Sequence, residues 1–149
     1  MTVNTFQLRI VRWRDSTAAL RAVREAVFIL EQQVPEALEW DAFDPVSIHV
    51  LATASDGEPI GTARLLPDGH IGRMAVLKAW RGEGIGSAML RCLLDRAKHN
   101  GITEIKLNSQ VTAKTFYARF GFQETGDEFI EAGILHISMF LRISQEPVC

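Results

Sequence analysis

The feature that most constrains this chain is a glycine-rich turn between an apolar run and a helical pattern. The run 72–77 is apolar enough for a strand, and the turn 81–86 carries three glycines at a spacing of two. Glycine has no side chain, so a glycine-rich turn lets other groups approach the backbone closely. A following helix starts with N–H groups that lack intrahelical partners, and its dipole adds partial positive charge there. The stretch therefore predicts a cradle for an anion such as a phosphate or pyrophosphate.

The spacing of the glycines separates this turn from two common phosphate loops. The Walker A pattern needs a Gly-Lys-Ser/Thr ending, which does not occur in the sequence. The dinucleotide pattern G-x-G-x-x-G, counted from Gly82, meets Ser87 instead of its last glycine, and no repeated βαβ units surround it. Nucleotide binding of either kind is therefore disfavoured. The pattern that fits is Arg81-x-x-Gly84-x-Gly86, of the form R/Q-x-x-G-x-G/A.

The rest of the chain alternates between strand and helix patterns. Asp-Gly pairs divide three short strand-like runs, which predicts an antiparallel meander. A helical pattern then leads to a further strand, which predicts a parallel pair with a right-handed crossover. The order predicts an α+β fold, with helices on both faces of a mixed, mostly antiparallel sheet of six or seven strands. We expect strands at 6–12, 47–54, 59–66, 70–76, 104–108 and within 122–143, a helix capped by Asp15 or Ser16 and ended before Pro35, helices at 84–99 and 113–119 (the latter capped by Thr112), and a short helix or ordered loop at 36–44.

Length and composition narrow the class of protein. A chain of 149 residues, 47% apolar and 23% charged, predicts a single globular domain over 1–149. A net charge of −2 offers no basic field for nucleic acid or an anionic membrane, and no apolar run is long enough to span a bilayer. Cys92 and Cys149 lack metal-ligand spacing, so no metal site is expected. With no signal-peptide pattern at the N-terminus, these features predict a cytoplasmic protein.

A second motif lies after the strand at 104–108. Asn108 is followed by the segment 113–122, which reads AKTFYARFGF. With both motifs in place, the chain resembles the GNAT superfamily of acetyl-CoA-dependent N-acetyltransferases, which carry a similar A-x-x-F-Y-x-x-x-G-F segment. Its order of elements is similar to that of the family along nearly the whole chain. It also resembles small bacterial members with E-Q-x-V-P and E-A-G-I-x-H motifs, found here at 31–35 and 131–136.

The resemblance implies that acetyl-CoA is the co-substrate and that backbone amides of the glycine turn hold its pyrophosphate. It also implies that the strand ending at 74–76 splays from the next strand, so that its free backbone pairs with the pantetheine arm and a backbone N–H near Val76 faces the thioester oxygen. Asn108 is expected to bind the pantetheine or to cap the next turn. The basic side chains near the two motifs are expected either to bind phosphate groups or to be solvated surface charges. The expected coenzyme-binding residues are Met74, Ala75, Val76, Arg81, Gly82, Glu83, Gly84, Ile85, Gly86, Ser87, Asn108, Lys114 and Phe116.

Acetyl transfer also needs an acid for the departing thiolate and a base for the amine. Tyr117, the only tyrosine, is our expected general acid, because a phenol with a pKa near 10 can protonate a thiolate. The alternative is a packed aromatic side chain. Glu31 and His136 are the expected bases, with His49 and Glu131 as further candidates. Each has a structural alternative, such as Glu31 neutralising Arg24. Arg64 and Arg73 face either the pocket or the solvent.

These expectations combine into one function with stated alternatives. The leading hypothesis is acetyl transfer to a primary amine of a small molecule, by direct attack in a ternary complex. The acidic residues from Glu31 to Asp44 suggest a cationic acceptor. The alternatives are a protein N-acetyltransferase and a catalytically idle coenzyme-binding or sensor domain. The family resemblance makes a homodimer an option, although no patch in the sequence demands one.

Overall fold

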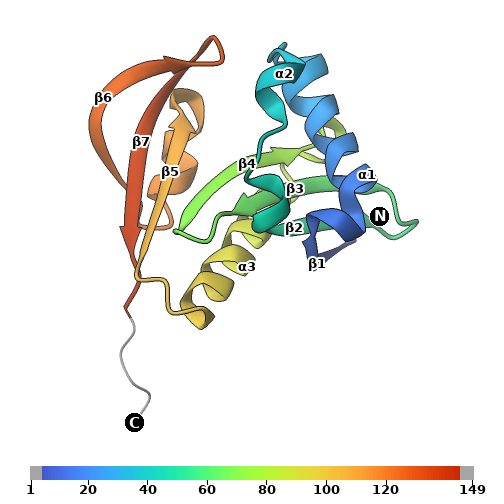
Figure 1. Cartoon of the computed structure of the whole chain (residues 1–149), viewed down its shortest axis with the longest axis horizontal. Helices are drawn as coiled ribbons and strands as arrows, with labels where there is room; N and C mark the ends of the chain where they lie inside the picture. The colour runs from blue at the N-terminus through green and yellow to red at the C-terminus, as the bar shows by residue number, and fades with distance from the viewer. Residues whose placement is uncertain (1–4, 145–149) are drawn as a thin grey trace.

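The computed structural model describes residues 5–144 and contains a seven-stranded sheet with helices on both faces (Figure 1). The strand order is β1-β2-β3-β4-β5-β7-β6, and every neighbouring pair is antiparallel except the parallel pair β4–β5. This confirms the predicted α+β fold and the parallel crossover. The strands are β1 Phe6–Arg12, β2 Ile48–Ala54, β3 Pro59–Leu65, β4 His70–Val76, β5 Glu104–Gln110, β6 Gln123–Glu131 and β7 Ile134–Arg142. The helical segments are α1 Trp13–Arg24, η1 Glu25–Glu31, α2 Glu36–Glu39, η2 Asp44–Val46, η3 Lys78–Trp80, α3 Ile85–His99, η4 Val111–Ala113 and α4 Lys114–Ala118.

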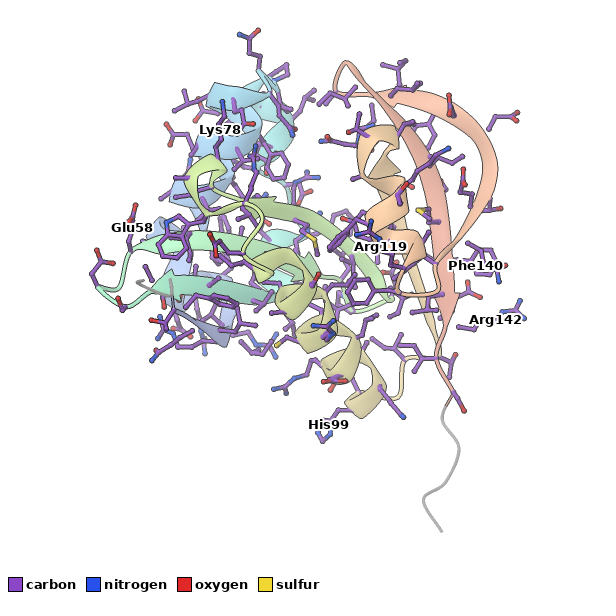
Figure 2. The ribbon with its side chains drawn as sticks, turned by 180° about the vertical axis from the view of Figure 1, so that it is seen from behind. Glu58, Lys78, His99, Arg119, Phe140 and Arg142 are labelled. Carbon is purple, nitrogen blue, oxygen red and sulfur yellow. The ribbon has the colours of Figure 1, made fainter. Side chains whose placement is uncertain are left out.

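The helices α1 and α3 cover opposite faces of the first half of the sheet, as the two opposite views in Figures 1 and 2 show. The main core lies under α3, whose buried side chains recur at helical spacing and pack against β2 and β3. On the other face, Val23 and Val27 pack against Ala75 of β4. The buried side chains of α3 are Ile85, Met89, Leu90, Leu93 and Ala97.

A β-bulge interrupts β4. Thr62 pairs with Ala75 and Arg64 pairs with Gly72, so Arg73 and Met74 together oppose the single residue Ala63. Arg73 has a φ of +52°, in the left-handed region that non-glycine residues seldom adopt. The extra residue reverses the facing of the strand, so that Ile71 belongs to the core under α3 and Ala75 packs against α1 and η1.

The parallel strands β4 and β5 separate soon after they meet. Only His70–Lys106 and Ile71–Leu107 are paired, although β4 continues to Val76 and β5 to Gln110 within the described residues. The predicted splaying of the two strands is therefore present in the structure. It leaves one backbone edge of the end of β4 open to a ligand.

Two predicted helix caps were wrong. The first helix begins at Trp13 without a side-chain cap, and the backbone of Ser16 departs from helical geometry. The helix then widens into the π-helix η1, where Gln32 N–H donates to the carbonyl of Val27 at 3.0 Å, because five-residue hydrogen bonds replace four-residue ones. Thr112 does not cap α4, since it lies inside the 3₁₀ turn η4 that precedes the helix. Residues 36–44 contain the short helix α2, and Cys149 lies outside the described residues.

Candidate active site

The glycine turn has the geometry of an anion cradle. Gly82 and Gly84 have φ values of +81° and +82°, and a Cβ at either position would meet nothing within 4 Å. The backbone conformation therefore demands glycine, and the space around both residues is open. Ala88 N–H donates to the carbonyl of Gly84, but the N–H groups of residues 85–87 donate to no other group that the structure describes. These three donors, at the start of the fifteen-residue helix α3, suit a pyrophosphate.

The two sequence motifs meet through Phe116. A Cβ on Gly86 would lie 3.6 Å from Cζ of Phe116, an ordinary contact, so the ring of Phe116 packs against the first turn of α3. The Phe116 ring also meets Tyr117 edge-on, with centroids 5.0 Å apart. Packing of α4 on the cradle therefore fixes the backbone position from which the Tyr117 side chain extends. Lys114 forms an ion pair with Glu124 at 3.5 Å.

Arg81 is held by an ion pair with Glu31. Its two terminal nitrogens donate to the two carboxylate oxygens of Glu31, each at 2.7 Å, and its Nε donates to the carbonyl of Val76 at 3.0 Å. The hydrogen bonds from Arg81 lower the pKa of Glu31. Glu31 was an expected base, but a carboxylate with a lowered pKa is a weaker base, and Glu31 does not line the cavity beside Tyr117. Its contacts favour a positioning role at the glycine turn.

A cavity of about 660 Å³ opens where β4 and β5 separate. Tyr117 lines it and donates a hydrogen bond to Sδ of Met74 at 3.6 Å. Burial raises the pKa of Tyr117 to about 12, so the hydroxyl stays protonated at neutral pH. Asn108 also lines the cavity and accepts a hydrogen bond from Ser138 at 2.9 Å. Of the expected site residues, those that line this cavity are Met74, Asn108, Tyr117 and His136, with Arg64, Arg73 and Glu131 among the further candidates.

His136 is buried at the cavity wall in a fixed orientation. Its Nδ1 lies 2.7 Å from the carbonyl of Ile134, which can only accept, so Nδ1 carries the proton. In the neutral ring, Nε2 is then the free acceptor, and it lies 3.7 Å from a carboxylate oxygen of Glu131. The ring stacks on Phe129 with centroids 5.9 Å apart. These contacts give His136 the geometry of a general base with a neighbouring carboxylate.

The acidic segment after Glu31 is not a free negative surface. Arg24, which is 1% exposed, pairs with Glu39 and with Asp44, each at 2.7 Å. Arg64 pairs with Asp41 at 2.7 Å and with Asp44 at 3.0 Å. Arg73 pairs with Glu39 at 3.2 Å and with Asp41 at 3.1 Å. Three arginines thus neutralise three carboxylates, and this removes the basis for expecting a cationic acceptor. It also shows that Glu31 is not the partner of Arg24.

The pKa values of two carboxylates in this network shift in opposite directions. Desolvation raises the pKa of Glu39 despite its bond to Arg24. Desolvation acts likewise on Asp44, but the hydrogen bonds and charges of Arg24 and Arg64 outweigh it and lower the pKa. His49 is fully buried beside the network, with Nε2 2.9 Å from the carbonyl of Asp44. It does not line the cavity, so this candidate base has a structural role.

Sequence reasoning did not identify a pair of glutamines beside the cavity. Gln110 donates to Gln32 at 2.9 Å, and Gln32 donates back at 3.5 Å. Both residues line the cavity, and their bonds join the end of η1 to β5. Their positions in two distant segments gave no local signal, because an amide pair of this kind has no characteristic spacing.

An anion cradle beside two splayed strands suits an extended co-substrate that carries a pyrophosphate. Comparison with known proteins gives the class of the protein: the family described as "Acetyltransferase (GNAT) domain" matches residues 16–143. The chain is 37% identical over 143 residues to the Bacillus subtilis protein named "Uncharacterized protein YyaT", which covers 92% of this chain and 95% of the relative. It is also 37% identical over 122 residues to "Uncharacterized N-acetyltransferase YjcF" of B. subtilis, covering 78% and 86% of the two chains.

A solved structure agrees with these relatives. The crystal structure of an acyl-CoA N-acyltransferase from Pseudomonas aeruginosa superposes with a TM-score of 0.82 at 29% identity, covering 91% of this chain and 99% of that one. The chain belongs to the GNAT family. It is accordingly an acyltransferase whose co-substrate is acetyl-CoA or another CoA-linked acyl donor. Between residues 5 and 144, no helix is both long and apolar enough to cross a membrane.

Proposed function

We propose that this protein transfers an acetyl group from acetyl-CoA to a primary amine of a small molecule, by direct attack in a ternary complex. The observation that carries the proposal is the shared cavity of Tyr117 and His136 at the point where β4 leaves β5. One side chain there can give a proton and the other can take one. A substrate lying between them would meet both.

The donor half of the site is the cradle and the open edge of β4. The unpartnered N–H groups at the start of α3 bind the pyrophosphate, and the backbone of 74–76 pairs with the pantetheine arm. A backbone N–H near Val76 donates to the thioester oxygen as negative charge develops on it. In other enzymes such a donor contributes about 2.7–4 kcal/mol to transition-state stabilisation.

The acceptor half supplies the base. His136 Nε2 takes a proton from the amine, either directly or through a water molecule, and Glu131 stabilises the resulting imidazolium. The neutral amine attacks the thioester carbon, the C–N bond forms, and the C–S bond breaks. The departing thiolate receives its proton from the hydroxyl of Tyr117, and the second proton that the nitrogen releases as the amide forms restores this hydroxyl through solvent. The products are the N-acetylated amine and coenzyme A.

A coenzyme A release assay with acetyl-CoA and a panel of amines tests this function. We expect thiol release with one class of amine, and acetyl-CoA binding measurable by calorimetry. Binding without release from any amine or peptide would support the idle or sensor alternative instead. Release only with peptides would indicate a protein N-acetyltransferase. The homodimer and the cytoplasmic location stay predictions. Size-exclusion chromatography tests the first, and cell fractionation tests the second.

A further inference from the structure

Two arginines on the cavity wall have more hydrogen-bond donors than the neighbouring carboxylates use. Arg64 is 5% exposed and donates to Asp41 and Asp44 through one terminal nitrogen, Nη1, while its buried Nε has no partner among the described residues. Arg73 uses Nε and Nη2 for Glu39, Asp41 and the carbonyl of Leu38. Its Nη1 makes no hydrogen bond within residues 5–144. Among these residues, Arg73 Nη1 therefore remains an unused donor at the cavity, whereas Arg64 Nε is buried out of reach of a ligand.

The bulge in β4 directs Arg73 to this position. Its φ of +52° belongs to conformations that cost roughly 1–3 kcal/mol for a non-glycine residue and persist where the surrounding structure enforces them. Bulges of this kind re-aim a side chain next to an active site. The guanidinium of Arg73 lines the cavity and is only partly exposed, at 27% of its side chain. The strained backbone thus places a cation where a substrate would lie.

The backbone that carries this cation adjoins the proposed reaction centre. Arg73 is followed directly by Met74, whose sulfur lies 3.6 Å from the hydroxyl of Tyr117. Consecutive Cα atoms are about 3.8 Å apart, so the anchor of the guanidinium adjoins the expected thioester position. Arg73, Met74 and Tyr117 line the same cavity of about 660 Å³, which limits the distance between a group bound by Arg73 and an amine attacking that thioester.

The three carboxylates on this wall of the cavity are already paired with arginines. Glu39, Asp41 and Asp44 are each paired with two arginines, and the six side chains sum to zero net charge. A cationic acceptor would find no uncommitted carboxylate there. The remaining acidic group of the cavity is Glu131, which is 54% exposed and lies beside His136. The site thus offers arginine donors on one wall and a base with a carboxylate on another.

Resting on the proposed function of the cavity, we propose that the acceptor is an amine that also carries a carboxylate a few bonds away, as in an amino acid. Arg73 binds the carboxylate through its unused Nη1 donors, in a charge-assisted hydrogen bond. The amine then points toward Met74 and His136. Phe28, Leu38 and Phe43 line the cavity with apolar surface that suits an apolar side chain.

Matched acceptors that differ only in the carboxylate test this inference. Phenylalanine is compared with phenethylamine and phenylalanine amide, and leucine with isoamylamine, by coenzyme A release. We expect the wild type to prefer the carboxylate member by about 10- to 100-fold in kcat/KM, the ratio typical of hydrogen bonds to a charged group. Arg73→Gln should bring that ratio close to one, mainly through KM for the acceptor, and Arg73→Lys should restore part of it. Arg14→Gln, at a side chain 88% exposed on α1, should keep the wild-type ratio.

A second measurement separates this inference from the proposed function. Binding of N-acetylphenylalanine and N-acetylphenethylamine to the coenzyme A complex is measured by calorimetry, which needs no turnover. Tighter binding of the carboxylate product, lost in Arg73→Gln with an unchanged coenzyme A affinity, supports the assignment even if no amine is acetylated. Equal binding of the two products, or a wild-type preference for amines without a carboxylate, overturns it while leaving the transferase function standing.

Discussion

Glu31 and Arg81, fifty residues apart in the chain, form an ion pair with two nitrogen–oxygen distances of 2.7 Å. The pair joins the end of η1 to the glycine turn 81–86. Because Arg81 also donates to the carbonyl of Val76, one guanidinium connects the helix, the loop and the end of β4. The arginine of the glycine motif is therefore committed to holding the loop in place.

Replacing Glu31 by glutamine separates the two roles considered for this residue. In the positioning role, Glu31→Gln raises the KM for acetyl-CoA several-fold and leaves kcat close to the wild-type value. The change in unfolding free energy should stay below about 1 kcal/mol, because the pair is partly exposed. Steady-state kinetics at saturating acceptor measure both constants. A fall in kcat of a hundredfold or more, with unchanged KM, would return Glu31 to the role of base.

Replacing Tyr117 by phenylalanine removes the proposed acid and little else. Tyr117→Phe should lower kcat by roughly 10²–10⁴ while acetyl-CoA binds as in the wild type. Among the residues that the structure describes, the hydroxyl donates only to Met74, so loss of the bond should have a small effect on stability. Calorimetry and the release assay together measure the two effects. A wild-type rate with a good acceptor would show that the thiolate takes its proton elsewhere.

Alanine at Gly84 tests the anion cradle. Gly84→Ala should cost about 1–2 kcal/mol of unfolding free energy, because a left-handed φ is unfavourable for alanine, and should also weaken acetyl-CoA binding. Gly57→Ala is the matched control, since Gly57 has a φ of +89° and equally open surroundings in the β2–β3 turn. The control should lose similar stability in denaturant unfolding but keep its coenzyme affinity. Equal affinity losses in both variants would argue against a cradle at the turn.

Stability should fall on mild acidification because of His49. Burial lowers the pKa of this histidine, and protonation would place a second N–H at Nδ1, which has no partner among the described residues. Below the unfolded pKa of about 6.5, the unfolded chain therefore binds a proton that the folded chain does not. The unfolding free energy should decrease by up to about 1.4 kcal/mol per pH unit, from pH 6.5 down to the lower folded pKa.

Urea unfolding of His49→Gln between pH 7.5 and 5.5 measures this contribution. The variant should lose most of the pH dependence in that range. His99→Gln is the control, because His99 is exposed at the end of α3, where Figure 2 shows it directed away from the sheet. It should keep the wild-type slope. If His49→Gln retains the full slope, another group titrates in that range.

The sequence by itself determined the features that depend on local pattern. The strand 70–76 was predicted with its observed bounds, since its apolar residues and the flanking Asp-Gly turn define a strand without reference to distant parts. Gly82 and Gly84 also follow from local physics, because only glycine adopts their backbone angles without strain. The order of these elements, together with the family resemblance, was enough for the α+β class and the parallel crossover between β4 and β5.

Only the tertiary structure decided which side chains meet. The bulge at Arg73 arises from the register between β3 and β4, and the pairs Glu31–Arg81 and Gln32–Gln110 join segments far apart in the sequence. The acidic residues after Glu31 appeared free to bind a cation, but folding places Arg24, Arg64 and Arg73 against them. The physical reason is that an ion pair depends on the distance between two groups in space and on their burial. The packing of helices on the sheet sets both, and the local spacing of residues in the sequence does not.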